Sequence, residues 1–186
     1  MHQQRAPRAA RLLIGMTLAA ILIALLVVAA GCASSTATAA SGPPTPTPTT
    51  EQRLAALARH AATGPNVQHV DTTYSAQDGT VTVTVTLGGS VPVADADVSA
   101  MQQRVMSMCF QTQKALWTSG ILLHSVTVTI VGPVRDLYGE RAMQAYAAAV
   151  LTAAIAAKFD WGTLSADTAW GQYDNVFLRP VYYDVG

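Results

Sequence analysis

The sequence is poor in cysteine and in charge. It contains only two cysteines, Cys32 and Cys109, and charged residues make up 12% of its 186 residues. Because Cys109 is the only cysteine from residue 51 onward, no disulfide can form within that part of the chain. We therefore expect packing to supply its stability, with Cys109 buried as a small hydrophobic residue among apolar helical neighbours.

Motifs for catalysis or metal binding are also absent. There is no Gly-x-Ser-x-Gly, no Ser-x-x-Lys and no glycine-rich phosphate loop with a lysine. The histidines after residue 31 are His60, His69 and His124, whereas structural zinc needs four nitrogen or sulfur ligands at regular spacing. The sequence therefore favours a protein with no cofactor, no metal and no catalytic residues.

The charge changes along the chain. The first 11 residues hold three arginines and no acid, and the chain after residue 31 keeps 8 Lys and Arg against 11 Asp and Glu, so 8 − 11 = −3. A mildly acidic domain lacks the basic surface that binds nucleic acid. It also lacks a polybasic patch for anionic lipid.

The N-terminal segment has the three parts of a secretory signal. The arginines Arg5, Arg8 and Arg11 precede an apolar run over residues 12–30, which ends in small residues. Nineteen apolar residues could also span a bilayer, so an uncleaved membrane anchor is the alternative.

The stretch Leu26-Val27-Val28-Ala29-Ala30-Gly31-Cys32 resembles the lipobox of bacterial lipoprotein precursors, with Ala29 where leucine is more usual. The resemblance covers residues 1–32. It implies a signal peptide over residues 1–31 and a diacylglycerol on Cys32, which would hold the protein on the outer side of the cell membrane. Two acyl chains anchor a protein stably, whereas one holds it only marginally.

Residues 32–50 have the composition of a linker. They consist almost entirely of Ala, Ser, Thr, Gly and Pro, and end in Pro43-Pro44-Thr45-Pro46-Thr47-Pro48. Such a segment cannot bury enough apolar area to fold, and its proline-rich end should be extended. It separates the membrane from a single domain over residues 51–186.

Periodicity predicts the elements of this domain. Thr49 and Gln52 fit a capping box, Asp78-Gly79 is a strong hairpin turn, and the second strand alternates valine with threonine. The expected elements are a helix over 51–62, strands over 67–75 and 80–87, a helix over 97–119, a strand over 125–131, an alanine-rich helix over 140–159 and a short helix over 166–173.

These elements predict an α+β fold in the order α-β-β-α-β-α. We expect a three-stranded mixed sheet, in which an antiparallel hairpin is joined by one parallel strand. Two long helices should cover the valine face, the first helix should lie at an edge, and the threonine face should stay open. The tail after residue 160 holds six of the twelve aromatic residues.

The segment over residues 51–131 is similar to the BON domain, a small module of bacterial envelope proteins. The similarity consists of the element order and of Asp78-Gly79-Thr80-Val81 before the second strand. The Gly-Val pair that such domains place before the last strand is absent, and Leu122-Leu123-His124 stands there. No named family is identified for the domain as a whole.

Three groups of residues are candidates for function. Trp161, Trp170 and Tyr173 have rings that stack on sugars, although an aromatic tail more often closes a core. The threonine face offers hydroxyls to a partner strand or a polysaccharide, although a solvated sheet face is the simpler interpretation; its residues are Thr82, Thr84, Thr127 and Thr129. His69 and Asp71 share one strand face and form a possible acid–base pair, the alternative being surface residues.

The leading hypothesis is a membrane-tethered extracytoplasmic lipoprotein whose domain binds or scaffolds an envelope component without catalysis. A module for a small ligand or a glycan, using the tail aromatics, is one alternative. A cell-wall hydrolase using His69 and Asp71 is the other. The expected partners are the membrane, through the anchor on Cys32, and an envelope protein or glycan, but no nucleic acid.

Overall fold

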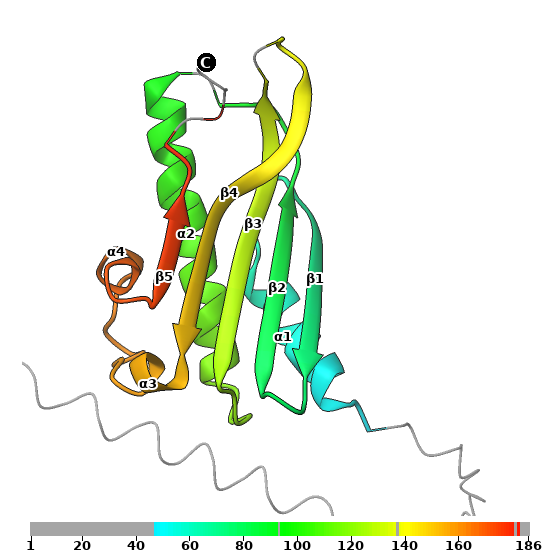
Figure 1. The fold of residues 1–186 in the computed structure, drawn as a ribbon, viewed down its shortest axis with the longest axis vertical. Helices are drawn as coiled ribbons and strands as arrows, with labels where there is room; N and C mark the ends of the chain where they lie inside the picture. Colours follow the sequence, from blue (N-terminus) through cyan, green and yellow to red (C-terminus); the bar gives the residue numbers. More distant parts are fainter. Residues whose placement is uncertain (1–46, 93, 137, 181, 183–186) are drawn as a thin grey trace, which may run out of the picture. The chain divides into compact units, whose positions relative to one another are not determined.

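The computed structural model describes residues 47–92, 94–136, 138–180 and 182. These residues form a five-stranded sheet with helices on one face (Figure 1). The strands follow one another across the sheet in chain order; β2 and β3 are parallel and the other pairs antiparallel. The elements are α1 (Thr50–Ala61), β1 (Val67–Ser75), β2 (Thr80–Leu87), α2 (Asp95–Trp117), β3 (Ser125–Arg135), β4 (Arg141–Thr152), α3 (Ala153–Ala156), α4 (Ala166–Trp170) and β5 (Asn175–Leu178).

The first half of the domain follows the sequence pattern. The capping box of Thr49 and Gln52 is present in α1. The hairpin of β1 and β2 and the parallel pairing of β2 with β3 are confirmed. Alternation in β2 buries its valines and leaves its threonines on the other face, as period two requires.

The predicted three-stranded sheet and the helix over residues 140–159 are wrong, although the α+β class is confirmed. Residues 141–152 form strand β4, and the helix that follows has only four residues. Alanine favours helix in isolation, but β3 offers an edge along which eleven residue pairs form. Helix propensity is a weak bias that such pairing overrides. The strand β5, in the aromatic tail, was not predicted.

Strand β3 also continues past Gly132-Pro133, where the sequence predicted its end. Pairing with β2 stops at Val131, so at Pro133 strand β3 has a neighbouring strand only on the side of β4. Proline has no backbone N–H to donate, but on the side without a neighbouring strand no inter-strand hydrogen bond is lost. A bulge at Tyr146 interrupts the β4 register, because Ile130 pairs with Ala147 but Val131 with Ala145. The bulge turns the Tyr146 ring onto Gly132.

Helix α1 packs against the edge strand β1 and against α2, so it lies at an edge of the sheet as predicted. The prediction of two long helices on the valine face is wrong, because only the helix over 97–119 forms, as α2, whereas the predicted helix over 140–159 is mostly strand β4. The side chain of Gln113 on α2 is fully buried, and its Nε2 donates to the carbonyl of Ala149 at 3.0 Å. Small alanines in β4 therefore let α2 approach the backbone of the sheet.

The helix in the C-terminal tail is shorter than expected. Ser165 caps α4, accepting a hydrogen bond from the Thr168 N–H at 3.3 Å, but the helix ends at Trp170 instead of Tyr173. The predicted signal peptide, Cys32 and the linker up to residue 46 lie outside the described residues. In the part of the chain that is described, no helix has the length and apolar character needed to cross a bilayer.

Candidate functional site

Strand β1 forms one edge of the sheet. Within the described ranges it pairs only with β2, so its outer side presents backbone N–H and C=O groups to solvent. A bulge at Gln68 disturbs the start of the strand, but the register runs without interruption from His69 to Ser75. A regular exposed edge of this kind is a template on which another strand can pair.

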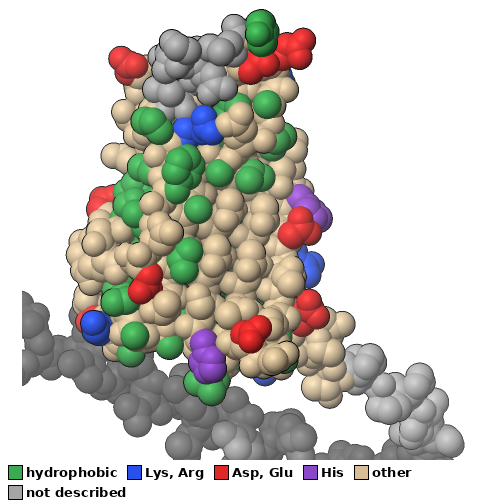
Figure 2. All heavy atoms as spheres, in the orientation of Figure 1, with side chains coloured by type: hydrophobic (Ala, Val, Ile, Leu, Met, Phe, Trp, Pro, Cys, Tyr) green, Lys and Arg blue, Asp and Glu red, His purple; other side chains and the backbone are tan. Residues whose placement is uncertain are grey.

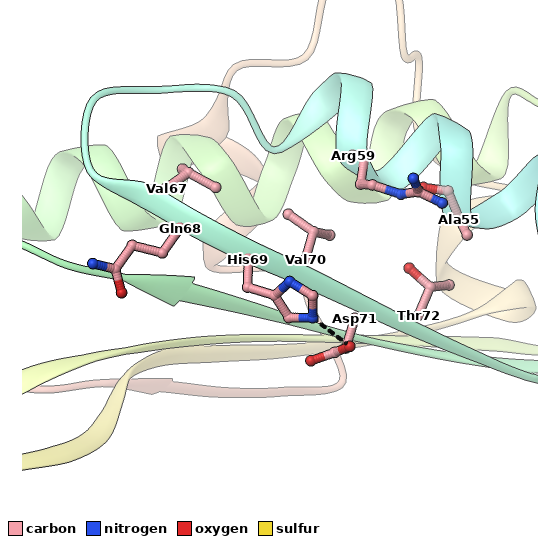
Figure 3. A pocket seen from close by; sticks show the side chains of 8 residues that line it. All are labelled: Ala55, Arg59, Val67, Gln68, His69, Val70, Asp71 and Thr72. Atoms are coloured by element: carbon pink, nitrogen blue, oxygen red, sulfur yellow. Dashed lines mark hydrogen bonds and ion pairs between the residues drawn. The ribbon is translucent and has the colours of Figure 1, made fainter.

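Helix α1 turns this edge into a groove. The groove has a volume of about 600 Å³ and runs between α1 and the outer side of β1 (Figure 3). Helix α1 provides Ala55 and Arg59, and the strand provides the other wall. The strand residues are Val67, Gln68, His69, Val70, Asp71 and Thr72.

The two faces of β1 give the groove two different sides. Figure 3 shows Val70 and Thr72 pointing to the side of α1, whereas His69 and Asp71 point to the opposite side, at the rim. The hydroxyl of Thr72 is buried and has no hydrogen-bond partner among the residues described.

Arg59 supplies a positive charge on the helical side of the groove. Its Nε donates to the carbonyl of Ala55, one turn earlier in α1, at 3.2 Å, which holds the stem along the helix. The side chain is exposed, and the ion pair found in the described part of the domain does not involve it. The guanidinium therefore remains available to a carboxylate.

The ion pair at the rim joins His69 and Asp71. Nε2 of His69 lies 2.9 Å from a carboxylate oxygen of Asp71, and the two side chains are 65% and 67% exposed. Exposed pairs contribute little to stability. Acid–base catalysis usually works in a site that shifts pKa values by burial, so this open position suits a binding contact better than a reaction.

The face of the sheet opposite α1 and α2 is polar at its centre. Thr82 pairs directly with Thr127, and Thr84 with Thr129, so the four predicted threonines are neighbours across β2 and β3. Figure 2 shows this face: uncharged polar side chains cover the middle, and apolar side chains gather over β4 and β5. The threonine surface borders the rim at Asp71, which pairs with Thr84.

The predicted aromatic residues form one cluster at the α2–α4 side. Trp161 lies against Phe110 and Phe159, at ring-centroid distances of 6.1 Å and 5.1 Å. Trp170 and Tyr173 meet edge to face at 5.9 Å. Tyr173 is buried, and burial raises the pKa of its hydroxyl. The cluster is three-dimensional, not a flat platform, and a role of these rings in ligand binding stays a prediction.

The histidines do not come together. Strand β2 lies between β1 and β3, so His69 and His124 are not on neighbouring strands. Nδ1 of His124 instead lies 2.9 Å from the carbonyl of Asp78, at the hairpin turn. Among the described residues, no group of three His, Cys, Asp or Glu side chains is arranged to hold a metal ion.

Sequence reasoning found His69 and Asp71 but missed the groove they border. It placed α1 at an edge correctly, but no local pattern showed that Arg59 and Thr72 face the same space. Comparison with known protein families, with curated proteins and with solved structures finds no match for this chain.

Proposed function

We propose that this protein is a lipid-anchored extracytoplasmic binding protein whose domain takes up an extended segment of another envelope protein at the edge of β1. The observation that supports this most is the groove of about 600 Å³ between α1 and that edge. Recognition by strand addition combines main-chain hydrogen bonds, which give affinity, with side-chain pockets, which give specificity. The anchor is supported by the resemblance of residues 26–32 to a lipobox.

The groove indicates the chemistry of the segment. Pairing is possible along His69 to Ser75, seven residues in regular register. Side chains of the added strand that point toward α1 would meet Val70, Thr72 and Arg59. An apolar residue beside Val70 and an acidic residue opposite Arg59 fit this side. Side chains on the other face would lie beside the polar His69–Asp71 rim and the threonines.

The groove resembles a binding site more than a catalytic site. Each main-chain hydrogen bond gained contributes only about 0.5–1.5 kcal/mol, so several are needed together. An uninterrupted edge supplies such a set. The hydrolase alternative depends on the exposed His69–Asp71 pair alone, and exchange of His69 for alanine without loss of a wall-cleaving activity would remove it.

Site-specific photocrosslinking in the full chain, expressed in its native membrane, tests the proposal. A photoreactive residue at the exposed position Thr73 in β1 should crosslink to one defined protein, whereas the same residue at the exposed position Gln103 in α2 should not. Equal crosslinking at both positions would contradict docking at β1, as would no product at Thr73.

Two charge reversals on α1 form a matched pair for the same experiment. Arg59→Glu reverses the charge inside the groove, and Arg53→Glu makes the same change at an exposed position that does not line it. We expect the crosslink at Thr73 to fall by about tenfold with Arg59→Glu, the equivalent of one charge-assisted hydrogen bond. Arg53→Glu should leave it unchanged.

A further inference from the structure

A second hollow lies at the end of the domain where α2 stops and α3 begins, at the bottom of Figure 1. Its volume is about 420 Å³, within the range of small-molecule sites. Every side chain that lines it is apolar. We call it the apolar groove; its lining is Trp117, Ile121, Leu122, Leu123, Ala153, Ala156, Ala157, Phe159 and Trp161.

Two features of the apolar groove have no explanation within the domain. Leu122 is 82% exposed although it is flanked by the groove lining Ile121 and Leu123. Full burial of such a side chain is worth about 1.5–3 kcal/mol, which is left unused here. The indole N–H of Trp117 is buried and has no hydrogen-bond partner within the described part of the chain. An apolar ligand in the groove would cover Leu122.

Charges of both signs lie around the apolar groove. The domain is acidic overall, yet the only two lysines of the chain are here. Lys158 stands between the lining residues Ala157 and Phe159, and Lys114 is one helical turn before Trp117. Two acids also lie nearby: Asp160 stands between the lining residues Phe159 and Trp161, and the carboxylate of Asp174 accepts from the N–H of Thr152, next to the lining residue Ala153, at 2.7 Å. Hydrogen bonds from Thr163 and Gly162, and more weakly Lys114, keep the pKa of Asp160 below the usual range.

The chain enters the domain at the same end. Helix α1 begins at Thr50 in the lower part of Figure 1, the end that carries α3 and the loop after α2. Seventeen residues separate Cys32 from Thr50, and even fully extended they reach at most roughly 60 Å. A lipid on Cys32 would therefore keep this end within reach of the membrane surface.

We propose that the apolar groove binds an acyl chain of a membrane phospholipid, with the headgroup phosphate beside Lys114 and Lys158. This inference rests on the proposed lipid anchor, which brings the groove to the bilayer. The acyl chain covers Leu122 and fills the space against Trp117 and Trp161, and the lysines reach the headgroup from the rim. The contact would orient the domain, leaving the β1 edge free to meet its partner.

Tryptophan quenching by brominated lipid measures this contact directly. The full chain is reconstituted into vesicles of phosphatidylcholine and phosphatidylglycerol, the latter brominated on its acyl chains. Two of the three tryptophans line the apolar groove, and Trp170→Phe removes the one that does not. Because a pocket buries most of its ligand, we expect emission to fall about twofold. Leu122→Asp should abolish the fall, whereas Tyr138→Asp, at another highly exposed apolar residue outside the groove, should not.

A second arm in detergent micelles that contain the brominated lipid needs no anchor and separates the two proposals. If the chain does not bind vesicles but its tryptophan emission is quenched in micelles, the result would contradict the proposed lipid anchor and support lipid binding in the apolar groove. If the chain binds vesicles but its emission is not quenched in the parent, Leu122→Asp or Tyr138→Asp forms, the result would contradict lipid binding in the apolar groove and leave the anchor supported.

Discussion

Gly132 is the position in β3 at which the structure allows no side chain. A Cβ at this residue would lie 2.6 Å from two ring carbons of Tyr146, closer than real Cβ contacts come. The ring has little freedom to move. Tyr146 is 1% exposed, its hydroxyl donates to the carbonyl of Pro133, and its ring meets that of Tyr182 edge to face at 4.3 Å.

The expected cost of Gly132→Ala follows from what must shift. Overpacking a closed site costs about 1–3 kcal/mol. If the ring moves, the Pro133 hydrogen bond adds about 1 kcal/mol, and the aromatic pair about another 0.5–1.5 kcal/mol. Because movement of the ring relieves part of the overpacking, we expect the free energy of unfolding to fall by about 2–4 kcal/mol.

Urea unfolding followed by circular dichroism measures this change. With a slope of about 2 kcal/mol/M, the midpoint should fall by roughly 1–2 M. Gly171→Ala is the control, because its φ of −74° suits alanine and no atom lies within 4 Å of the added Cβ. In a double-mutant cycle, adding Tyr146→Ala to Gly132→Ala should cost less than the sum of the single changes. A midpoint unchanged by Gly132→Ala, or strictly additive costs, would refute this reasoning.

Two further predictions concern buried groups. Burial raises the pKa of Tyr146 and of Tyr182 from 10.0 to about 12, so folding keeps both hydroxyls protonated; their contribution to stability is complete below pH 10.0 and is lost as pH rises toward 12. Urea midpoints should therefore fall over this range, and a Tyr146→Phe, Tyr182→Phe double variant should show a smaller fall if the account holds. Burial also raises the pKa of the Cys109 thiol, so a thiol reagent should modify this residue in denaturant but not in the folded chain. Modification of Cys109 in the folded chain would contradict its burial. Cys32 should stay unreactive in both conditions if it is lipidated.

The sequence correctly predicted those elements in which the local conformational preference agrees with the contacts made in the folded domain. The alternation of valine and threonine in β2, the Asp78-Gly79 turn and the regular apolar stripe of α2 each favour the structure that forms. Residues 141–152 behave differently because their intrinsic preference is for helix, and the deciding factor is the free edge of β3, distant in sequence. Missing that strand also removed β5 from the prediction, since β5 pairs only with β4 within the described residues.

The candidate site was predictable only in part. His69 and Asp71 stand two residues apart on a strand, so their proximity follows from period two. The groove does not follow from any local pattern, because it depends on how α1 lies beside β1. Likewise, Trp161 was singled out for its ring, but its position against α3 and the loop after α2 depends on β4 being a strand.

Hydrogen exchange of the full chain tests the β1 docking site most directly. The chain in its native membrane, with its partner present, is compared with the same chain purified in detergent. We expect the amides among residues 69–75 that point away from β2 to exchange at least about tenfold more slowly in the membrane sample, the effect of about 1.4 kcal/mol of protection. The opposite edge strand, β5, should show no change. Equal exchange of β1 in the two samples, or equal slowing of β5, would contradict strand addition at β1.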